Sequence, residues 1–323
     1  MNYRTLGRSG LKVSILGMGT GGLDPLGVKS GCSEAEMVDF LRFAFDCGIN
    51  LFDTSPDYGG SGRSECILGQ AAREIGRDQM VISTKMALAG GMPDEPLHLM
   101  RPEDMASSLD ASLRRLKTDY VDLLLMAVAD VPEHFDRVID DLLPELIKLK
   151  EQGKIRCIGS SEQTRSDGAH IWLQRVLPTD RVDVAMVGHN MINQSAQRTL
   201  FPLCQQNNIG VLNIFTVRNL FANPPRLRQV IGDLKERKVL SEDALPATDP
   251  LGWLLEDGEC QSLIEAAYRY AAYTAGVTSV MCGAIARWQL EQDIAFVGKG
   301  TLSTGKLGRL RQTFGHIDEA VGN

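Results

Sequence analysis

Residues 50–59, which read NLFDTSPDYG, decide how the rest of the chain is interpreted. Their apolar run ends in the carboxylate of Asp53, and the phenol of Tyr58 follows on a turn. Residues 81–85, VISTK, repeat the pattern, because a β-branched run ends there in the amine of Lys85. Both runs are typical of buried parallel strands. The carboxyl ends of such strands meet at one rim, where parallel α/β proteins place their active sites.

Strand-like runs alternate with amphipathic helical stretches along the whole sequence. The expected strands are residues 15–18, 51–54, 81–85, 121–126, 155–159, 182–187, 211–215 and 279–282. Helices are expected over residues 33–47, 64–75, 102–116, 138–151, 167–177, 197–207 and 261–275. This uninterrupted alternation predicts an α/β fold, a (β/α)8 TIM barrel, and a single domain over residues 1–323.

Local signals refine this barrel. Ser33 and Glu36 predict a capping box at the start of the first helix. Residues 3–13, with a Gly-Arg-Ser-Gly turn, predict an N-terminal β-hairpin that caps the opposite end of the barrel. Two insertions, residues 86–100 and 216–257, predict long loops after strands 3 and 7 that shape a ligand site.

The composition excludes several classes of partner. The net charge is −7 with both signs dispersed, which argues against a nucleic-acid partner. We expect no membrane association, because no apolar run is long enough to span a bilayer and the first residues lack a secretory signal. Seven scattered cysteines, without a CxxC pair, are expected to be reduced thiols in the cytoplasm and not zinc ligands: Cys32, Cys47, Cys66, Cys157, Cys204, Cys260 and Cys282.

Asp53, Tyr58 and Lys85 together have the chemistry of a proton donor. A phenol is a weak acid, with an unperturbed pKa of about 10, and a neighbouring ammonium makes any phenol a stronger acid. Taken singly, such residues are more often turn caps, packing residues or solvated side chains. Their order and spacing in a barrel series favour the catalytic interpretation.

With these features the chain resembles the aldo-keto reductase superfamily over nearly its whole length. The likeness rests on Phe-Asp-Thr at 52–54 with Tyr58-Gly59, on Thr84-Lys85, and on runs at 3–7, 9–14, 64–69, 120–123, 153–159 and 276–283. The resemblance implies reduction of a carbonyl compound by hydride transfer from NADP or NAD. Tyr58 would then be the acid, Lys85 the cation that strengthens it and Asp53 the partner that orients Lys85.

The resemblance also implies which residues surround the dinucleotide. They are Gly19, Thr20, Ser161, Glu162, Met186, Phe215, Arg218, Gly283, Arg287 and Gln289. Arg287 is expected to be the cation for the 2′-phosphate of NADP, because Ile285 and Ala286 stand where the family commonly has polar or basic residues.

The chain departs from the family's pattern around the reacting centre. Ala127 stands where the family has a histidine that hydrogen-bonds the substrate carbonyl, and losing such a donor costs about 3–4 kcal/mol of transition-state stabilisation. Glu162 and Met186 replace an asparagine and a glutamine of the nicotinamide pocket. Ile214 aligns with the aromatic residue under the nicotinamide, and a one-residue slip would assign that role to Phe215.

These departures leave three hypotheses open. His189, at the end of the sixth strand, is a candidate substitute for the missing histidine. The acid–base trio is also compatible with a lyase or isomerase that uses no hydride. The third is a non-enzymatic binding or regulatory subunit. The trio favours an enzyme acting on a small-molecule carbonyl substrate, because a binding module needs no activated phenol.

Overall fold

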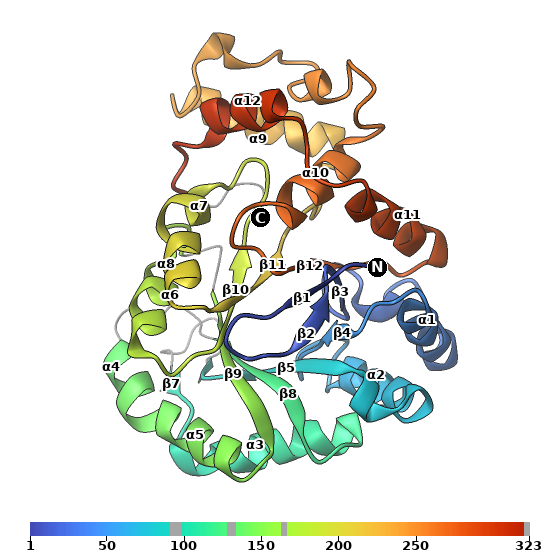
Figure 1. Cartoon of the computed structure of the whole chain (residues 1–323), viewed down its shortest axis with the longest axis vertical. Coiled ribbons are helices and arrows are strands. Elements are labelled where there is room, and N and C mark those ends of the chain that lie inside the picture. Colours follow the sequence, from blue (N-terminus) through green and yellow to red (C-terminus); the bar gives the residue numbers. More distant parts are fainter. Residues whose placement is uncertain (91–97, 128–133, 163–166, 320–323) are drawn as a thin grey trace.

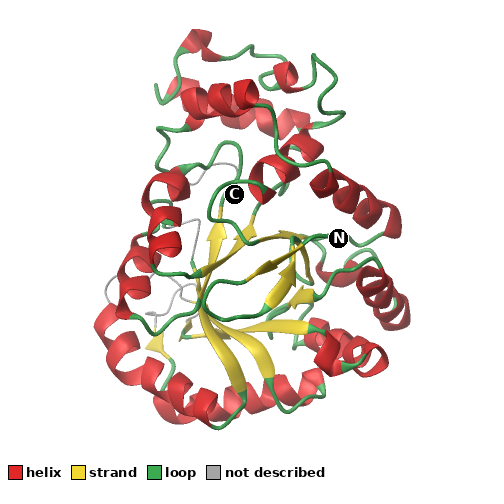
Figure 2. Ribbon diagram, viewed as in Figure 1, coloured by secondary structure: helices red, strands yellow, loops and turns green. Residues whose placement is uncertain are grey.

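The computed structural model describes residues 1–90, 98–127, 134–162 and 167–319. Its centre is a closed barrel of parallel strands surrounded by helices (Figures 1 and 2). The strands are β3 (Leu16–Gly19), β4 (Leu51–Asp53), β5 (Val81–Ala87), β8 (Val121–Ala127), β9 (Ile155–Ser161), β10 (Val184–Gly188), β11 (Gly210–Ile214) and β12 (Ser279–Cys282). They close in this order, with β10 pairing both β9 and β11, which confirms the predicted (β/α)8 barrel.

Helices cover the outside of the barrel. They are α1 (Glu34–Asp46), α2 (Arg63–Ile75), α3 (Pro102–Leu116), α4 (Phe135–Arg137), α5 (Leu143–Glu151), α6 (Ile171–Val176), α7 (Ser195–Thr199), α8 (Phe201–Gln206), α9 (Pro224–Glu236), α10 (Leu263–Ala272), α11 (Arg287–Gly298) and α12 (Thr304–Phe314). The predicted capping box at α1 is present: Ser33 Oγ accepts the Glu36 N–H, and the Glu36 carboxylate accepts the Ser33 N–H. Both otherwise unpaired N–H groups are thereby satisfied.

Shorter elements link these helices and strands. They are the 3-10 turns η1 (Pro25–Gly27), η2 (Arg77–Gln79), η4 (Leu177–Thr179), η5 (Glu242–Ala244) and η6 (Gly252–Leu254), and the π-helix η3 (Val138–Leu142). After β5, an antiparallel pair forms between β6 (Ala89–Gly90) and β7 (His98–Leu99). Part of the long loop predicted there, residues 91–97, lies outside the described residues.

The amino-terminal hairpin closes one end of the barrel. Strands β1 (Tyr3–Thr5) and β2 (Lys12–Ser14) pair antiparallel, and Figure 1 shows them crossing the end of the barrel. Leu6, Leu11 and Val13 join the buried cluster inside the barrel, next to residues such as Leu51 and Val81 that begin the strands. The predicted hairpin is therefore confirmed, and the carboxyl ends of the strands remain as the place for a site.

Two of the expected helices are interrupted next to a proline. Residues 138–151 form η3 and then α5, and the change falls just before Pro144. Residues 197–207 are divided between α7 and α8, with the break at Leu200 before Pro202. Proline cannot donate a backbone hydrogen bond and restricts the residue before it, which explains both interruptions.

The helix expected over residues 167–177 is also shorter than predicted. It begins at Ile171, because the Asp167 carboxylate accepts the backbone N–H groups of Ile171 and Trp172 at 2.7 and 2.8 Å. His170 has a φ of +61°, which lies in the left-handed region and ends any helix that approaches from the N-terminal side. Asp167 therefore acts as a cap before the helix and not as part of it.

The long segment after β11 is folded around a second hydrophobic core. It contains α9, η5 and η6, and apolar residues of these elements pack against α10 and α12. Leu227, Ile231 and Leu234 of α9 lie in this core together with Leu310 and Phe314 of α12. Figure 1 shows α9 and α12 side by side beyond the barrel, above α10. The seventh loop is thus a small helical layer at the edge of the barrel.

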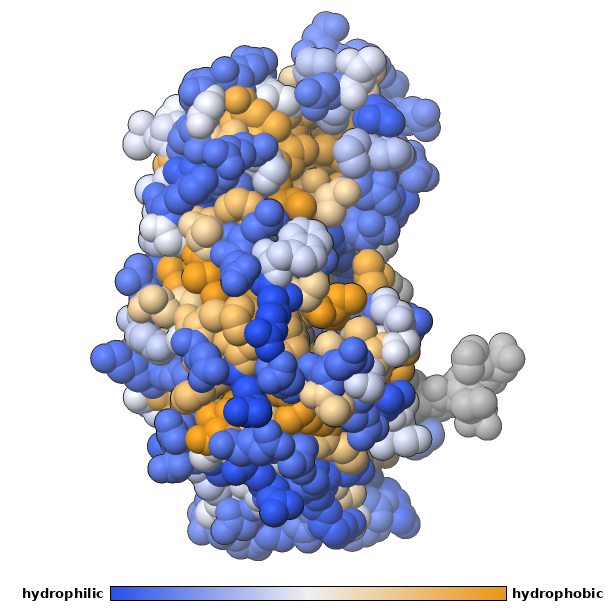
Figure 3. All heavy atoms as spheres, turned by 90° about the vertical axis from the view of Figure 1, so that its right-hand side faces the viewer, coloured by the Kyte–Doolittle hydropathy of each residue, from blue (hydrophilic) through white to orange (hydrophobic). Residues whose placement is uncertain are grey.

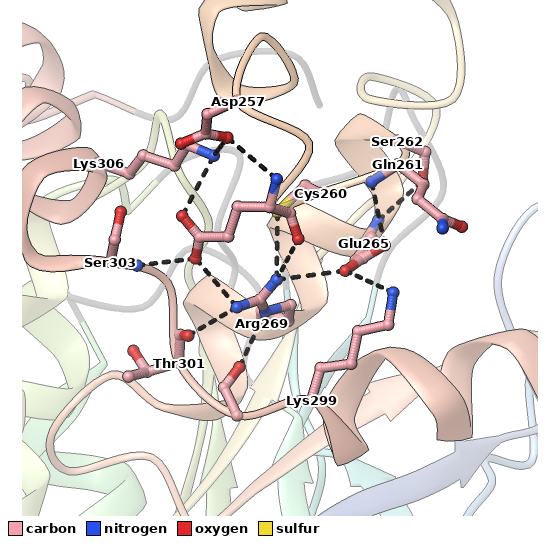
Figure 4. Close-up of polar contacts among 12 residues, drawn as sticks. Asp257, Cys260, Gln261, Ser262, Glu265, Arg269, Lys299, Thr301, Ser303 and Lys306 are labelled. Carbon is pink, nitrogen blue, oxygen red and sulfur yellow. Dashed lines mark hydrogen bonds and ion pairs between the residues drawn. The ribbon is translucent and has the colours of Figure 1, made fainter.

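Arg269 of α10 joins this helix to the segment before it and to the turn between α11 and α12 (Figure 4). Its guanidinium bonds the carboxylates of Glu259 and Glu265 and the carbonyl oxygens of Glu259, Gly300 and Thr301. Glu265 also accepts from Lys299 at 2.9 Å. Because each buried charge is paired and hydrogen-bonded, this network avoids the cost of burying isolated ions.

The surface mixes polar and apolar residues. Figure 3 shows hydrophilic side chains at both ends of one face, with hydrophobic ones interspersed between them. Trp288, at the start of α11, is the most exposed of the large aromatic residues among those described, at 60%. Within the described chain, no helix is long and apolar enough to cross a membrane.

Candidate active site at the carboxyl end of the barrel

The structure brings Asp53, Tyr58 and Lys85 together at the carboxyl end of the barrel. Asp53 is the last residue of β4, and Lys85 lies on the neighbouring strand β5. Lys85 Nζ donates to Asp53 Oδ2 at 2.6 Å and to the carbonyl oxygen of Thr54 at 2.9 Å. The lysine and aspartate side chains are only 10% and 6% exposed, so water screens this ion pair weakly.

The second oxygen of Asp53 is also fixed. Ser83 Oγ donates to Asp53 Oδ1 at 2.9 Å, from a position two residues before Lys85 on the same strand. Side chains two residues apart on a strand point to the same face, which here is the barrel interior. Ser83 was not among the residues predicted from the sequence, although the alternation of β5 places it beside Lys85.

Tyr58 lies over the lysine ammonium. Lys85 Nζ is 4.9 Å from the centroid of the Tyr58 ring. The ring packs so closely against the backbone of Gly21 that a Cβ at that position would come within 2.5 Å of it. Gly21 is a second residue that the sequence did not reveal, and it allows the loop after β3 to approach the ring.

The electrostatics keep Lys85 charged. Burial is the largest single influence and lowers the pKa of the ammonium, but the charge of Asp53 and the contact with Tyr58 together outweigh it. The pKa of Lys85 is therefore raised above its usual value. An ammonium that stays protonated beside a phenol stabilises negative charge on the phenol oxygen.

Ala127 and Ser161 lie next to each other on the interior of this rim. They are paired across β8 and β9, and Met186 pairs with Ser161 on β10. Leu125 and Met186 belong to the buried cluster inside the barrel, so every second residue of these strands faces inward. A methyl group at Ala127 provides no hydrogen-bond donor at this position of the rim.

His189 does not replace the missing histidine. Its ring is fully buried between Phe201 and Tyr270, at centroid distances of 5.1 and 5.4 Å, and Nδ1 bonds the carbonyl oxygen of Asn193. Burial lowers the pKa of His189 to about 3. The hypothesis of a substitute at His189 is therefore wrong, because this neutral ring packs beneath α8 and α10.

Several residues suit a bound dinucleotide. Phe215 follows β11 with a φ of +63° and is half-buried, and the guanidinium of Arg218 lies 3.7 Å from its ring centroid. At the end of β12, no atom of the described residues lies within 4 Å of the place where a Cβ of Gly283 would stand. At the end of β3, Gly19 precedes Thr20, whose buried Oγ1 has no hydrogen-bond partner within the described part of the chain. An aromatic ring, a cation and an uncrowded stretch of backbone suit the flat ring and the phosphates of a dinucleotide.

Other residues expected around the dinucleotide are engaged with the protein. Both carboxylate oxygens of Glu162 contact protein groups, the Gly188 N–H and His170 Nδ1. Arg287 pairs with Asp39 of α1, and its guanidinium lies over the ring of Phe43 at 4.6 Å. Glu162 and Arg287 therefore already have partners within the protein, with which a dinucleotide would have to share or compete.

The remaining expected residue, Gln289, caps a helix. Gln289 Oε1 accepts the backbone N–H of Ile285 at 3.1 Å, just before α11. This contact holds the turn between Gly283 and α11 in place. Among the residues that the structure describes, no cluster of three histidines, cysteines or carboxylates is arranged to hold a metal ion.

Comparison with known proteins identifies the family to which this parallel barrel belongs. The family model described as "Aldo/keto reductase family" matches residues 15–313. The chain therefore belongs to the aldo/keto reductase family, whose members act on small carbonyl compounds.

Individual relatives agree with this assignment. The chain is 31% identical to "L-galactose dehydrogenase" of Arabidopsis thaliana over 92% of its length and 88% of that protein's. It is 31% identical to "NADH-specific methylglyoxal reductase" of Escherichia coli over 64% of each chain. A solved aldo/keto reductase from Klebsiella pneumoniae, in complex with NADP and acetate, shares the fold at a TM-score of 0.66 and 21% identity, covering 97% of this chain and 96% of that one.

Proposed function

We propose that this protein reduces the carbonyl group of an aldehyde, ketone or sugar by hydride transfer from NADPH or NADH. The observation that carries the proposal is the arrangement of Lys85 between Asp53 and Tyr58 at the carboxyl end of the barrel. The names of the two relatives support it, since one is a reductase of a carbonyl compound and the other a dehydrogenase of a sugar.

Each residue of the trio has its own role in this proposal. Tyr58 donates its phenolic proton to the carbonyl oxygen of the substrate. The Lys85 ammonium stabilises the negative charge left on the phenol oxygen, and Asp53, held by Ser83, orients the ammonium. A bound reduced nicotinamide supplies the hydride. Without a histidine at position 127, Tyr58 polarises the carbonyl alone.

For the dinucleotide we propose a site built from three strand ends. Phe215 would stack against the nicotinamide, Arg218 would meet the phosphates, and Gly19, Thr20 and Gly283 would let the backbone approach closely. Ser161 and Met186 would line the nicotinamide pocket, and Gln289 would hold the turn near the adenosine. The neighbour solved with NADP supports a dinucleotide site of this kind.

We further propose that the chain works as one domain in the cytoplasm. All seven cysteines are free thiols, which suits a reducing compartment. The proposal favours a reductase over a lyase, an isomerase or a regulatory subunit because the family's named relatives include oxidoreductases.

Spectroscopic assays of the purified protein test the proposal. Loss of reduced-nicotinamide absorbance should follow addition of an aldehyde or sugar from a panel of small carbonyl compounds. Substrate-dependent oxidation of either NADPH or NADH would support the proposal. Turnover of a carbonyl compound without any dinucleotide would favour the lyase or isomerase alternative.

A further inference from the structure

A buried chain of three side chains joins the strand ends of the proposed nicotinamide pocket to two outer helices. Glu162, directly after β9, places Oε2 2.6 Å from His170 Nδ1, and His170 Nε2 lies 2.8 Å from Ser195 Oγ. His170 is the N-cap residue of α6, and Ser195 is the first residue of α7. The Glu162 and His170 side chains are 0% and 1% exposed, so bulk water does not reach this chain.

Ser195 continues this chain to the backbone. Its Oγ donates to the carbonyl oxygen of Gly168 at 3.0 Å, and His170 Nε2 lies 2.8 Å away on its other side. Both ring nitrogens of His170 therefore have side-chain partners, Glu162 at Nδ1 and Ser195 at Nε2.

The other oxygen of Glu162 reaches the neighbouring strand. Oε1 accepts the backbone N–H of Gly188 at 2.8 Å. Gly188 is the last residue of β10, two positions beyond Met186, and it pairs with Ile214 of β11. The carboxylate thus links the ends of β9 and β10, while His170 and Ser195 tie the same point to α6 and α7.

We infer that Glu162 is a positioning residue that holds one wall of the dinucleotide pocket and does not itself contact the dinucleotide. This inference rests on the proposed function. Both oxygens of Glu162 contact protein groups, the Gly188 N–H and the His170 ring. Removing either Glu162 or His170 deletes the buried bond between them, which disturbs the strand ends on which Ser161 and Met186 lie.

A double-mutant cycle on dinucleotide affinity distinguishes a positioning residue from a ligand. Glu162→Gln keeps an acceptor for the Gly188 N–H but removes the carboxylate, and His170→Gln removes the imidazole ring. We expect each variant to weaken binding of NADPH and NADH about tenfold, and the double variant to bind no more weakly than either single one. Affinity follows from fluorescence titration with both dinucleotides. A large loss in Glu162→Gln with none in His170→Gln would overturn the inference.

Ser160→Ala is the matched control. Ser160 belongs to the same strand end, and its Oγ accepts a hydrogen bond from Trp172 Nε1 at 2.8 Å, outside the Glu162 chain. The control should keep the affinity of the wild type for both dinucleotides. An equal loss in the control would mean that any buried polar bond at this end of β9 has the same effect, which would contradict a specific role for Glu162.

Nitrogen NMR of the histidine ring provides a readout that needs no dinucleotide. We expect the ring nitrogen signals of His170 to change in Glu162→Gln and to stay as in the wild type in Ser160→Ala. Unchanged His170 signals in Glu162→Gln would overturn the bond between the two side chains even if the enzyme is an active reductase. Absence of dinucleotide binding in the wild type, with His170 signals that depend on Glu162, would overturn the proposed function and the positioning role while leaving the buried bond intact.

Discussion

The proposed acid of this site is the single hydroxyl group of Tyr58. Tyr58→Phe removes that hydroxyl and keeps the ring that packs against Gly21, so the fold should remain intact. We expect turnover to fall by about 10²–10⁴-fold, the usual contribution of a general acid. Tyr273→Phe, which deletes a hydroxyl bonded to Val297 on the outer helices, is the control and should keep its turnover. Equal turnover in wild type and Tyr58→Phe would place the acid elsewhere.

Ala127 offers a test by gain of function. Ala127→His introduces a donor beside Ser161 on the interior of the rim, where the substrate carbonyl would lie. Because one positioned donor typically contributes about a hundredfold in rate, we expect turnover to rise by up to that factor. Ala127→Phe adds a ring of comparable size without a donor and should not raise turnover. A gain in both variants would point to packing and not to hydrogen bonding.

Arg287 is the residue on which we expect any preference for NADPH to depend. Its side chain is 55% exposed and pairs with Asp39, so a 2′-phosphate would compete with an existing ion pair. We therefore expect NADPH to bind at most about fivefold more tightly than NADH, with the difference shrinking as salt rises. Calorimetry should show the preference lost in Arg287→Ala and increased in Asp39→Ala. A strong preference that survives Arg287→Ala would show that another group binds the phosphate.

At the residue level, the sequence indicates which side chains lie at the site more readily than it indicates which groups they contact. Asp53 and Lys85 end apolar runs, and this local pattern is enough to predict that both lie at one rim of the barrel. The ion pair between Arg287 and Asp39 spans two elements far apart in the chain, and no local pattern indicates it. The contact between Glu162 and His170 is not indicated for another reason. His170 lies in a turn before α6, where the sequence predicts helix.

Helices α10 and α11 meet through a buried acid that makes stability depend on pH. Tyr268 donates to Asp293 Oδ2 at 3.0 Å, and burial raises the pKa of Asp293 from 3.8 to about 7. The folded protein keeps this proton where the unfolded chain has lost it, so stability falls as pH rises from about 4 to 7 and is constant above.

Asp293→Asn removes this titration and keeps the shape of the side chain. We expect the variant to be more stable than wild type above pH 7, by as much as about 4 kcal/mol in unfolding free energy. The two proteins should be nearly equal in stability below pH 4. Urea unfolding across this pH range measures the difference. A variant that is less stable than wild type at every pH would show that the ionised carboxylate is the stabilising form.

At the level of elements, hydrophobic periodicity located all eight barrel strands. The errors in the predicted helices mostly have a cause in nearby residues. The interruptions before Pro144 and Pro202 follow from the missing N–H of proline, so the sequence contained the signal. The layer of α9 and α12 was harder to predict, because its apolar residues find their partners only when residues 220–245 and 302–317 meet in space.

For the whole molecule, the barrel fold and the family are those that the sequence predicts, whereas several contacts of the pocket residues are not. The hairpin closes the amino end, and the Arg269 network joins α10 to the turn before α12. The carboxyl end has the trio, lacks a histidine at position 127 and uses both oxygens of Glu162 for contacts within the protein. We propose that this altered pocket still transfers a hydride.

Deuterium transfer shows directly whether this pocket moves a hydride to a carbonyl carbon. The protein is supplied with NADPH or NADH carrying deuterium at the transferable position of the nicotinamide, together with a panel of small aldehydes, ketones and sugars. Mass spectrometry of the products should find one deuterium on the former carbonyl carbon with the wild type, and far less product with Tyr58→Phe. Conversion of a carbonyl compound to a product without deuterium, or no conversion with either dinucleotide, would contradict the account.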